Sequence, residues 1–235
     1  MTVLEQLLDA VGDDRGCEAA DRLCEACVRW FGADAAAISL VFDGVHVSTL
    51  GASGAAARAI DELQFTLGEG PCLDSVAGRT PVFVIDLADP DHRRWPAYSP
   101  AVLAYDMHGV CAMPVLVAGQ CLGALDLFSV APGVLSGAHL AGIGTAAELA
   151  EMAFLDLIGG DLHAAISDPD SSAWAELKAL SRAEVGQATG VLVAQLHVEP
   201  AVALVRLRAH AYATDAAATA VARDIIDHRL FLEAS

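Results

Sequence analysis

Two of the six cysteines, Cys24 and Cys27, form a C-x2-C pair, the spacing in this sequence that most directly suggests chemistry. A structural zinc site needs four ligands, usually from two such pairs, and the sequence contains no second pair. Cys17 stands seven residues before Cys24, so the three residues fall on one helix. The spacing favours buried core cysteines, and a metal or redox role is the alternative.

Eight histidines are spread along the chain without the spacing of a metal site. The sequence has no H-E-x-x-H motif, no G-x-S-x-G elbow, no P-loop and no G-x-G-x-x-G fingerprint. We therefore expect no metal and no cofactor, and a hydrolase, kinase or dehydrogenase has no positive support. The protein is predicted not to be an enzyme, with an enzyme of unmarked site as the alternative.

A glycine-rich loop, "LGEGPC" at residues 67–72, opens a series of motifs that resembles the GAF domain of bacterial signalling proteins. The series continues with the strand "PVFVIDL" at 81–87, the turn "RWP" at 94–96 and the hairpin "MPVLVAGQCLGALDLFS" at 113–129. The resemblance covers roughly residues 15–155.

This resemblance implies a small-ligand or dimerisation module with a sheet-floored pocket beneath loops. Cyclic-nucleotide-binding members typically carry an Asn-Lys-Phe…Asp-Glu signature, and this chain has no Asn and no Lys before Lys178, which excludes that subclass. Two alternatives stay open: a domain that binds nothing and only holds a dimer, and a redox sensor that uses Cys72 or the Cys24/Cys27 pair. The candidate ligand-binding residues are Gly68, Glu69, Gly70, Cys72 and Trp95.

A second resemblance begins at Arg182, where "RAEVGQATGVL" looks like the opening helix of the ANTAR domain. The family pattern is Arg, then Gln-Ala-Lys-Gly five residues on, then an aliphatic pair and Met. The match continues without a gap and covers about residues 173–232. Its later positions are Ala203-Leu204, Leu207-Arg208, Ala211 and Val221-Ala222.

The ANTAR resemblance implies a dimer that binds paired RNA stem-loops and acts as a transcription antiterminator. RNA recognition generally stacks unpaired bases on aromatic or Arg side chains and clasps the backbone with basic groups. Four departures from the family pattern leave open a degenerate domain that serves only dimerisation or protein interaction. The departures are Thr189 for Lys, Val193 for Met, Leu204 for Phe and Asp215 for Asn. The candidate RNA-binding residues are Arg182, Gln187, Gly190, Arg206, Arg208, His210, Tyr212 and Arg223.

Charge restricts where RNA could bind. Of 31 acidic and 13 basic residues, 23 acidic and 7 basic ones precede Asp170, so that part carries a net −16 of the total −18. Phosphate contacts need clustered Lys and Arg, which disfavours a generic polyanion binder and limits RNA contact to the C-terminal part. RNA binding gains support if Arg182, Arg208 and Arg223 share one exposed face, and it loses support if they pair with Glu184 or Asp224.

The elements that must position these residues alternate in the first part of the chain. Apolar residues at steps of three and four predict the first helix, apolar runs and one alternating run predict strands, and Asp43-Gly44 predicts a hairpin turn. Strands joined hairpin by hairpin, with helices at either end, indicate an antiparallel α+β sheet domain. Residues 88–100 are predicted to be a loop. The predicted helices are 20–31, 55–63 and 137–158, and the predicted strands are 35–42, 45–50, 81–85, 110–117 and 121–129.

The C-terminal part is predicted to be three helices: from Ser172 to about Leu196, from Pro200 to about Ala213, and from about Ala216. So short a bundle buries little apolar surface alone, so we expect it to dock or dimerise. Turn-rich residues before it divide the chain. The predicted domains are a GAF-like sensor at 1–158, a linker at 159–172 and an ANTAR-like domain at 173–235.

No signal peptide or membrane-spanning segment is predicted, because the N-terminus lacks a basic and apolar leader and residues 131–158 carry Glu148 and Glu151. We expect a cytoplasmic homodimer with free thiols. The predicted function is signal-responsive RNA binding, in which the sensor domain changes how the helices from Gly137 and Ser172 pair and thereby exposes the RNA face.

Overall fold

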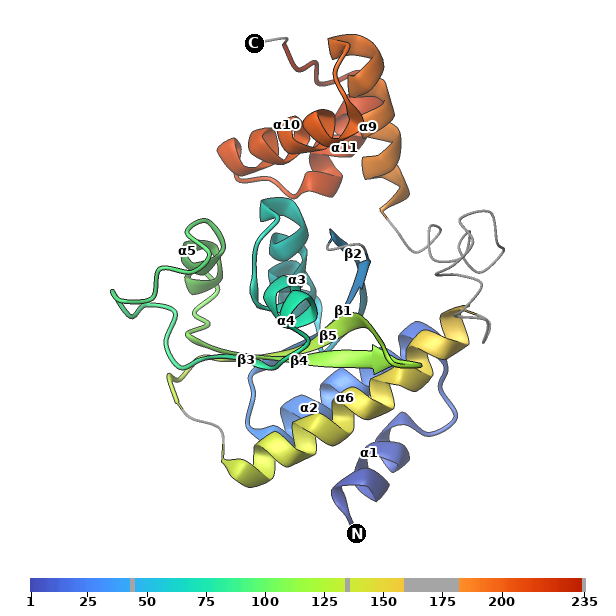
Figure 1. Ribbon diagram of the computed structural model, residues 1–235, viewed down its shortest axis with the longest axis vertical. Helices are drawn as coiled ribbons and strands as arrows, with labels where there is room; N and C mark the ends of the chain where they lie inside the picture. The colour runs from blue at the N-terminus through green and yellow to red at the C-terminus, as the bar shows by residue number, and fades with distance from the viewer. Residues whose placement is uncertain (43–44, 134–135, 159–181, 234–235) are drawn as a thin grey trace.

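The computed structural model describes residues 1–42, 45–133, 136–158 and 182–233 (Figure 1). A five-stranded antiparallel sheet in the order β2-β1-β5-β4-β3 forms the centre of the first part. This α+β architecture, followed by helices, confirms the predicted fold class. The strands are β1 (Ala35–Phe42), β2 (Val45–Ala52), β3 (Val82–Val84), β4 (Gly109–Val117) and β5 (Gln120–Ser129).

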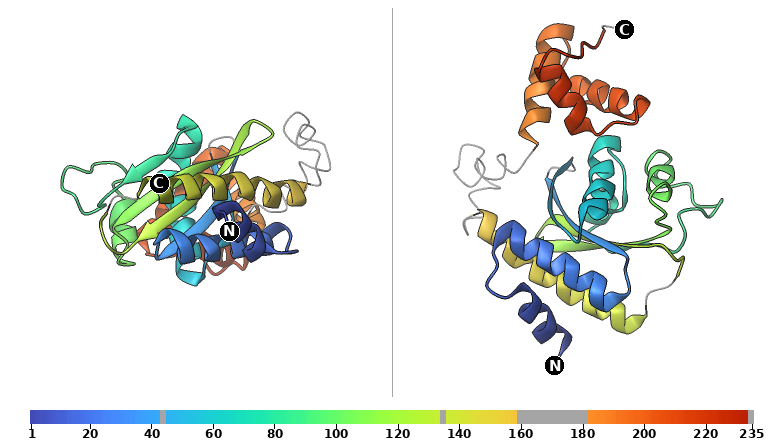
Figure 2. Two further views of the ribbon diagram at one scale, coloured as in Figure 1. Left: turned by 90° about the horizontal axis from the view of Figure 1, so that it is seen from below. Right: turned by 180° about the vertical axis from the view of Figure 1, so that it is seen from behind.

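Helices cover both faces of the sheet (Figures 1 and 2). One face is covered by α2 (Gly16–Phe31) and α6 (Gly137–Ile158), against which α1 (Val3–Val11) packs. The other face carries α3 (Ala55–Leu67), α4 (Pro71–Gly78) and α5 (Tyr98–Leu103).

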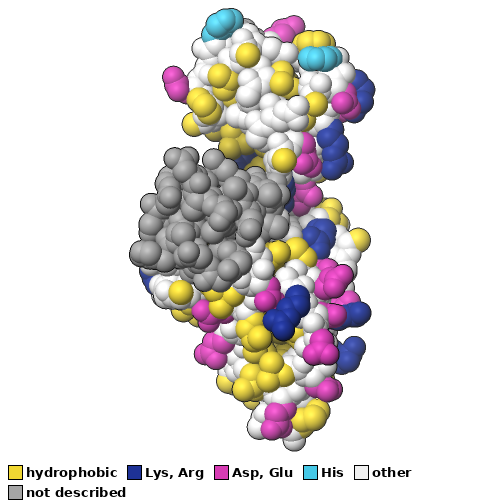
Figure 3. Space-filling view, turned by 90° about the vertical axis from the view of Figure 1, so that its right-hand side faces the viewer, with side chains coloured by type: hydrophobic (Ala, Val, Ile, Leu, Met, Phe, Trp, Pro, Cys, Tyr) yellow, Lys and Arg dark blue, Asp and Glu magenta, His cyan; other side chains and the backbone are white. Residues whose placement is uncertain are grey.

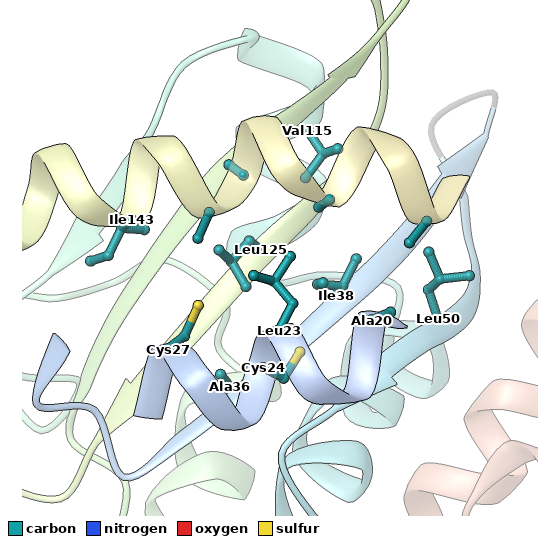
Figure 4. Close-up of a cluster of buried hydrophobic side chains, with 14 of the residues drawn as sticks. Ala20, Leu23, Cys24, Cys27, Ala36, Ile38, Leu50, Val115, Leu125 and Ile143 are labelled. Atoms are coloured by element: carbon teal, nitrogen blue, oxygen red, sulfur yellow. The ribbon is translucent and has the colours of Figure 1, made fainter. Parts of the chain in front are cut away.

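The larger core lies between the sheet and the α2–α6 layer (Figure 4). Side chains alternate along each strand, so Ile38 of β1 and Leu125 of β5 point into this core. A fully buried side chain of that size contributes about 1.5–3 kcal/mol. Cys24 and Cys27 are free thiols buried in the same core, which is the interpretation that their spacing favoured.

The same alternation sends Ser39 and Asp126 to the opposite face, under α3 and α4. Their strand neighbours on that face, Ala37 and Phe128, are apolar and buried. The fold therefore places two polar side chains in an apolar layer, next to the inward face of α3.

Three helices, α9 (Ala183–Leu196), α10 (Pro200–Ala213) and α11 (Ala218–Ile226), form a bundle with its own core. Phe65 of α3 belongs to that core, so the bundle docks on the sheet domain through α3. Two hydrogen bonds support the docking: Thr219 Oγ1 donates to Glu62 Oε1 at 2.6 Å, and the Ala218 amide donates to Thr66 Oγ1 at 3.3 Å.

Some predicted boundaries need correction. Helix α1 was not predicted, although Thr2 and Glu5 form a capping box at its start. The segment predicted as a loop contains the start of α5 at Tyr98. Helix α9 begins at Ala183 in the described residues, and the predicted start at Ser172 lies outside them. Across the described residues, no single helix is long and apolar enough to cross a membrane, and α9 with α10 fits a span by length and composition only as a pair bent by 107°.

Candidate functional site

A group of buried polar side chains lies between the sheet and α3, which we call the polar cluster. Its members come from β1, β2, α3, α4 and β5, and they are half-buried or fully buried. The polar cluster consists of Ser39, His46, Thr49, Asp61, Gln64, Cys72 and Asp126.

Asp61 is the centre of the polar cluster, and its carboxylate accepts four hydrogen bonds. Ser39 Oγ and Thr49 Oγ1 each donate at 2.5 Å, His46 Nε2 at 2.9 Å and Gln64 Nε2 at 3.3 Å. Burial alone would raise the pKa of Asp61, but His46 and the two hydroxyls stabilise the anion and lower it overall. Asp61 is therefore an ionised carboxylate without contact to solvent.

Gln64 connects Asp61 to the rest of the polar cluster. Its Nε2 also donates to Asp126 Oδ2 at 2.6 Å, and its Oε1 accepts the Cys72 amide at 2.8 Å. Gly70 must pass close to this side chain, because a Cβ on Gly70 would lie 2.4 Å from Gln64 Oε1. Gly70 also has φ +148°, a conformation that favours glycine. These contacts explain why the loop before α4 has a glycine at this position.

Two buried polar atoms near the polar cluster have no hydrogen-bond partner among the described residues: Asp126 Oδ1 and the Tyr98 hydroxyl. Burial, and then the neighbouring Asp61 charge, raise the pKa of Asp126 well above its usual range. The raised pKa favours the neutral form of this carboxyl group. Unpartnered buried polar atoms are costly, so this corner of the domain is a candidate ligand site.

The Cys72 thiol is poorly suited to redox chemistry. Burial raises its pKa well above the usual range, and the ionised Asp61 carboxylate nearby raises it further. Reactive cysteines are thiolates in electropositive, partly exposed surroundings. The redox alternative that used Cys72 therefore loses support.

Of the five predicted ligand-binding residues, the structure brings only Cys72 into the polar cluster. Glu69 Oε1 instead accepts the amides of Ala97 and Tyr98 at 2.7 and 2.8 Å, and so fixes the start of α5. Trp95 has φ +53° and donates from Nε1 to Asp74 at 3.0 Å. The other two are glycines at loop positions. Gly70 contacts Gln64, and Gly68 ends α3.

Sequence reasoning missed most of the polar cluster, including Asp61, Gln64 and Asp126. The available signal was the pattern of α3, where Asp61 and Gln64 stand one turn apart beside the apolar positions Ala57 and Ile60. A polar pair on the inward face of a helix marks either a satisfied core network or a site.

Arg182, a predicted RNA-binding residue, lies against the sheet domain. Its Nη1 donates to the Val47 carbonyl at 3.0 Å and lies 3.3 Å from His46 Nδ1. The guanidinium also stacks over the Phe65 ring at 4.2 Å and lies 4.0 Å from the Glu62 carboxylate. Burial lowers the pKa of Arg182, and Glu62 and Asp61 oppose that shift.

Arg208 stacks on the same Phe65 ring at 4.8 Å, and its Nε is buried without a partner among the described residues. Its Nη1 lies beside Gly68 at the end of α3. We call the stacking of Arg182 and Arg208 on Phe65 the Phe65 contact. It withdraws two predicted RNA-binding residues from solvent in this arrangement.

The other predicted RNA-binding residues are dispersed. Arg223 pairs with Glu184 at 3.2 Å, and Arg206 donates to the Glu233 carbonyl at 3.2 Å. The arginines therefore do not share one exposed face. On the face that Figure 3 shows, basic side chains of the bundle are interspersed with acidic ones. Gln187, Gly190 and Tyr212 are exposed, and His210 is half-buried.

Comparison with known families decides the identity of the sheet domain. A family model described as "GAF domain" matches residues 18–154, more than half of the chain. The chain belongs to the GAF family. Membership supports a signal-sensing regulatory module. No curated protein matches the sequence.

Solved structures with the GAF fold are similar to this chain at low sequence identity. The GAF domain of an Acinetobacter phosphoenolpyruvate-protein phosphotransferase has 14% identity and a TM-score of 0.52, and the match covers 69% of this chain and 92% of that one. A free methionine-R-sulfoxide reductase from Neisseria meningitidis has 20% identity and a TM-score of 0.49, over 65% and 86% of the two chains. The first of these likenesses shows the fold alone.

Proposed function

We propose that this protein is a signal-responsive RNA-binding regulator, of the antiterminator type, in which the GAF domain controls access to the three-helix bundle at about residues 173–235. The observation that carries the proposal is the Phe65 contact. Arginine planes bind RNA by stacking on unpaired bases. The Phe65 ring offers Arg182 and Arg208 a flat aromatic face like that of an RNA base. In this proposal, Phe65 therefore stacks on the arginines where a base would stack in the RNA-bound form.

The polar cluster connects to this contact through one side chain. His46 Nε2 donates a hydrogen bond to Asp61, and His46 Nδ1 accepts one from Arg182 Nη1. A signal that changes the polar cluster therefore acts directly on Arg182. Such coupling requires that the signal binds the docked and undocked bundle with different affinity.

The alternative is a protein-interaction module whose ANTAR-like domain no longer binds RNA. The specific observation in its favour is the pairing of Arg223 with Glu184, which leaves little free positive charge on the bundle. Thr189, where the family has Lys, also donates its hydroxyl to the Val185 carbonyl at 2.7 Å instead of presenting a charge.

The test is fluorescence anisotropy with a panel of labelled stem-loop RNAs. We expect Phe65→Ala to bind a stem-loop at least about tenfold more tightly than the wild-type chain, because it frees Arg182 and Arg208. Phe65→Leu, which keeps an apolar side chain but removes the ring, should have a smaller effect in the same direction. Phe83→Ala is the control, since Phe83 is half-exposed on β3 and both arginines stack on Phe65.

Circular dichroism must show that each variant is folded before its affinity is compared. If neither the wild-type chain nor the folded Phe65 variants bind any stem-loop, the RNA proposal is wrong and the protein-interaction alternative stands. Light scattering on the same samples tests the expected homodimer.

A further inference from the structure

The polar cluster contains three different metal-ligating groups. A ring nitrogen of His46, a carboxylate oxygen of Asp61 and the sulfur of Cys72 all lie within 4.8 Å of one another, and all three residues are buried. They come from β2, α3 and α4, so no motif spacing in the sequence predicts this group. A nitrogen, oxygen and sulfur set of this kind is characteristic of zinc.

A second observation is an unpartnered buried carboxyl oxygen beside these three groups. Asp126 is fully buried, and its Oδ1 has no partner among the described residues. Gln64 joins its other oxygen to Asp61. The polar cluster thus gathers two carboxyl groups and a thiol, and its only nitrogen base is one imidazole. A divalent cation would compensate the negative charge that this set carries once it is deprotonated.

We propose that the polar cluster is a Zn²⁺ site formed by His46, Asp61 and Cys72. Zinc bonds are about 2.0–2.3 Å long, so the three ligand atoms move closer together on binding. The Cys72 thiol loses its proton to solvent when it ligates the metal, and Asp61 is already ionised. The His46 ring proton moves from Nε2 to Nδ1, so the one proton released to solvent is that of Cys72.

Binding also changes His46, and this part of the inference rests on the proposed function. Its hydrogen bonds fit a ring whose Nε2–H donates to Asp61 and whose Nδ1 accepts from Arg182, which is a donor only. When Nε2 ligates zinc, the ring proton resides on Nδ1. Nδ1–H then faces an Arg182 N–H, two donors cannot bond, and the Phe65 contact weakens. Zinc is thus the signal that undocks the bundle.

Zinc and cobalt titrations of the full chain, after dialysis against chelator, test the site itself. We expect one equivalent of Zn²⁺ by calorimetry, and Co²⁺ should give the thiolate-to-metal absorption of a cysteine ligand. Cys72→Ser should remove that absorption and weaken zinc binding at least about 100-fold. Cys111→Ser is the control, because Cys111 is buried outside the polar cluster and should bind as the wild-type chain does. Absence of binding, or equal binding by folded Cys72→Ser, overturns the site.

Hydrogen exchange tests the coupling without RNA. In the wild-type chain, zinc should make the amides of α9 and α10 exchange at least about tenfold faster. In Cys72→Ser, zinc should leave their exchange rates unchanged. Unchanged exchange rates in a zinc-loaded wild-type chain would overturn the proposed coupling, while the proposed zinc site would still stand. Failure of the RNA proposal would alter neither readout.

Discussion

Asp61 shows how much a single buried residue can organise. Its charge would be costly in an apolar layer, but four donors from β1, β2 and α3 surround it. Those donors fix the side chains of His46 and Gln64, and each of these makes a further contact: His46 with Arg182 and Gln64 with Asp126 and Cys72. One carboxylate therefore sets the geometry of the candidate site and of its link to the bundle.

Gly70→Ala tests the close approach of the loop to Gln64. A Cβ there would lie 2.4 Å from Gln64 Oε1 at a φ of +148°, so we expect a loss of about 1–3 kcal/mol in the free energy of unfolding. Urea titration measures it. Gly186→Ala on α9 is the control, since a Cβ there meets nothing within 4 Å and should be neutral or stabilising by up to about 1 kcal/mol. Equal effects of the two variants would contradict the described contact.

Thiol labelling tests the placement of the cysteines. Burial raises the pKa of Cys27 and of Cys111 to about 12, and Cys17 is exposed. In the native chain at pH 8, an alkylating reagent should therefore modify Cys17 first, with Cys121 next. Mass spectrometry of the labelled peptides identifies the order. Fast labelling of Cys27 without urea would contradict the buried-core interpretation.

Helix α3 is the element on which the domain and the bundle meet. Its inward face carries Asp61 and Gln64, and its far end carries Phe65 and Glu62 toward the bundle. Residues three and four apart share a helix face, so a shift of α3 against the sheet moves both groups together. Helix α3 therefore links the polar cluster to the bundle, because it carries residues of both.

Thr219→Val tests the docking of α11 on α3. Thr219 donates to the Glu62 carboxylate at 2.6 Å. Removing a hydrogen bond to a charged group should weaken docking by about 1.5–3 kcal/mol. Native-state hydrogen exchange of α11 amides reports the change. Thr214→Val is the control, because Thr214 bonds within its own helix end and does not face α3. An unchanged exchange rate in Thr219→Val would show that the hydrogen bond does not hold the bundle.

Elements with local signals could be predicted from the sequence. Strand β1 lies where a short apolar run predicted a buried strand, and helix α6 has the predicted bounds 137–158. Helix α5 was missed because six residues with a proline inside give little periodicity. The polar cluster was missed for another reason: His46, Asp61, Cys72 and Asp126 come from four elements, and only strand pairing and helix packing bring them together. The burial of Arg182 likewise depends on Phe65, far away in the sequence.

At the scale of the whole molecule, the net charge and the docking of the bundle would both lower the affinity for RNA in the proposed function. The acidic first part carries most of the net charge of −18 and repels RNA, and the Phe65 contact withdraws two of the six basic residues that follow Asp170. Docking on α3 also provides the burial that so small a bundle needs. Under the proposed function, this docked arrangement is the form with low affinity for RNA.

The most direct test of this account compares the salt dependence of stem-loop affinity for Phe65→Ala and for Phe65→Ala/Arg182→Gln/Arg208→Gln. If the two arginines contact phosphates once they are released from Phe65, their removal should make the slope of log K against log salt shallower by roughly 1.4–1.8, about 0.7–0.9 for each contact. The affinity at low salt should fall with it. Equal slopes and equal affinities would contradict the claim that the Phe65 contact conceals RNA-binding residues.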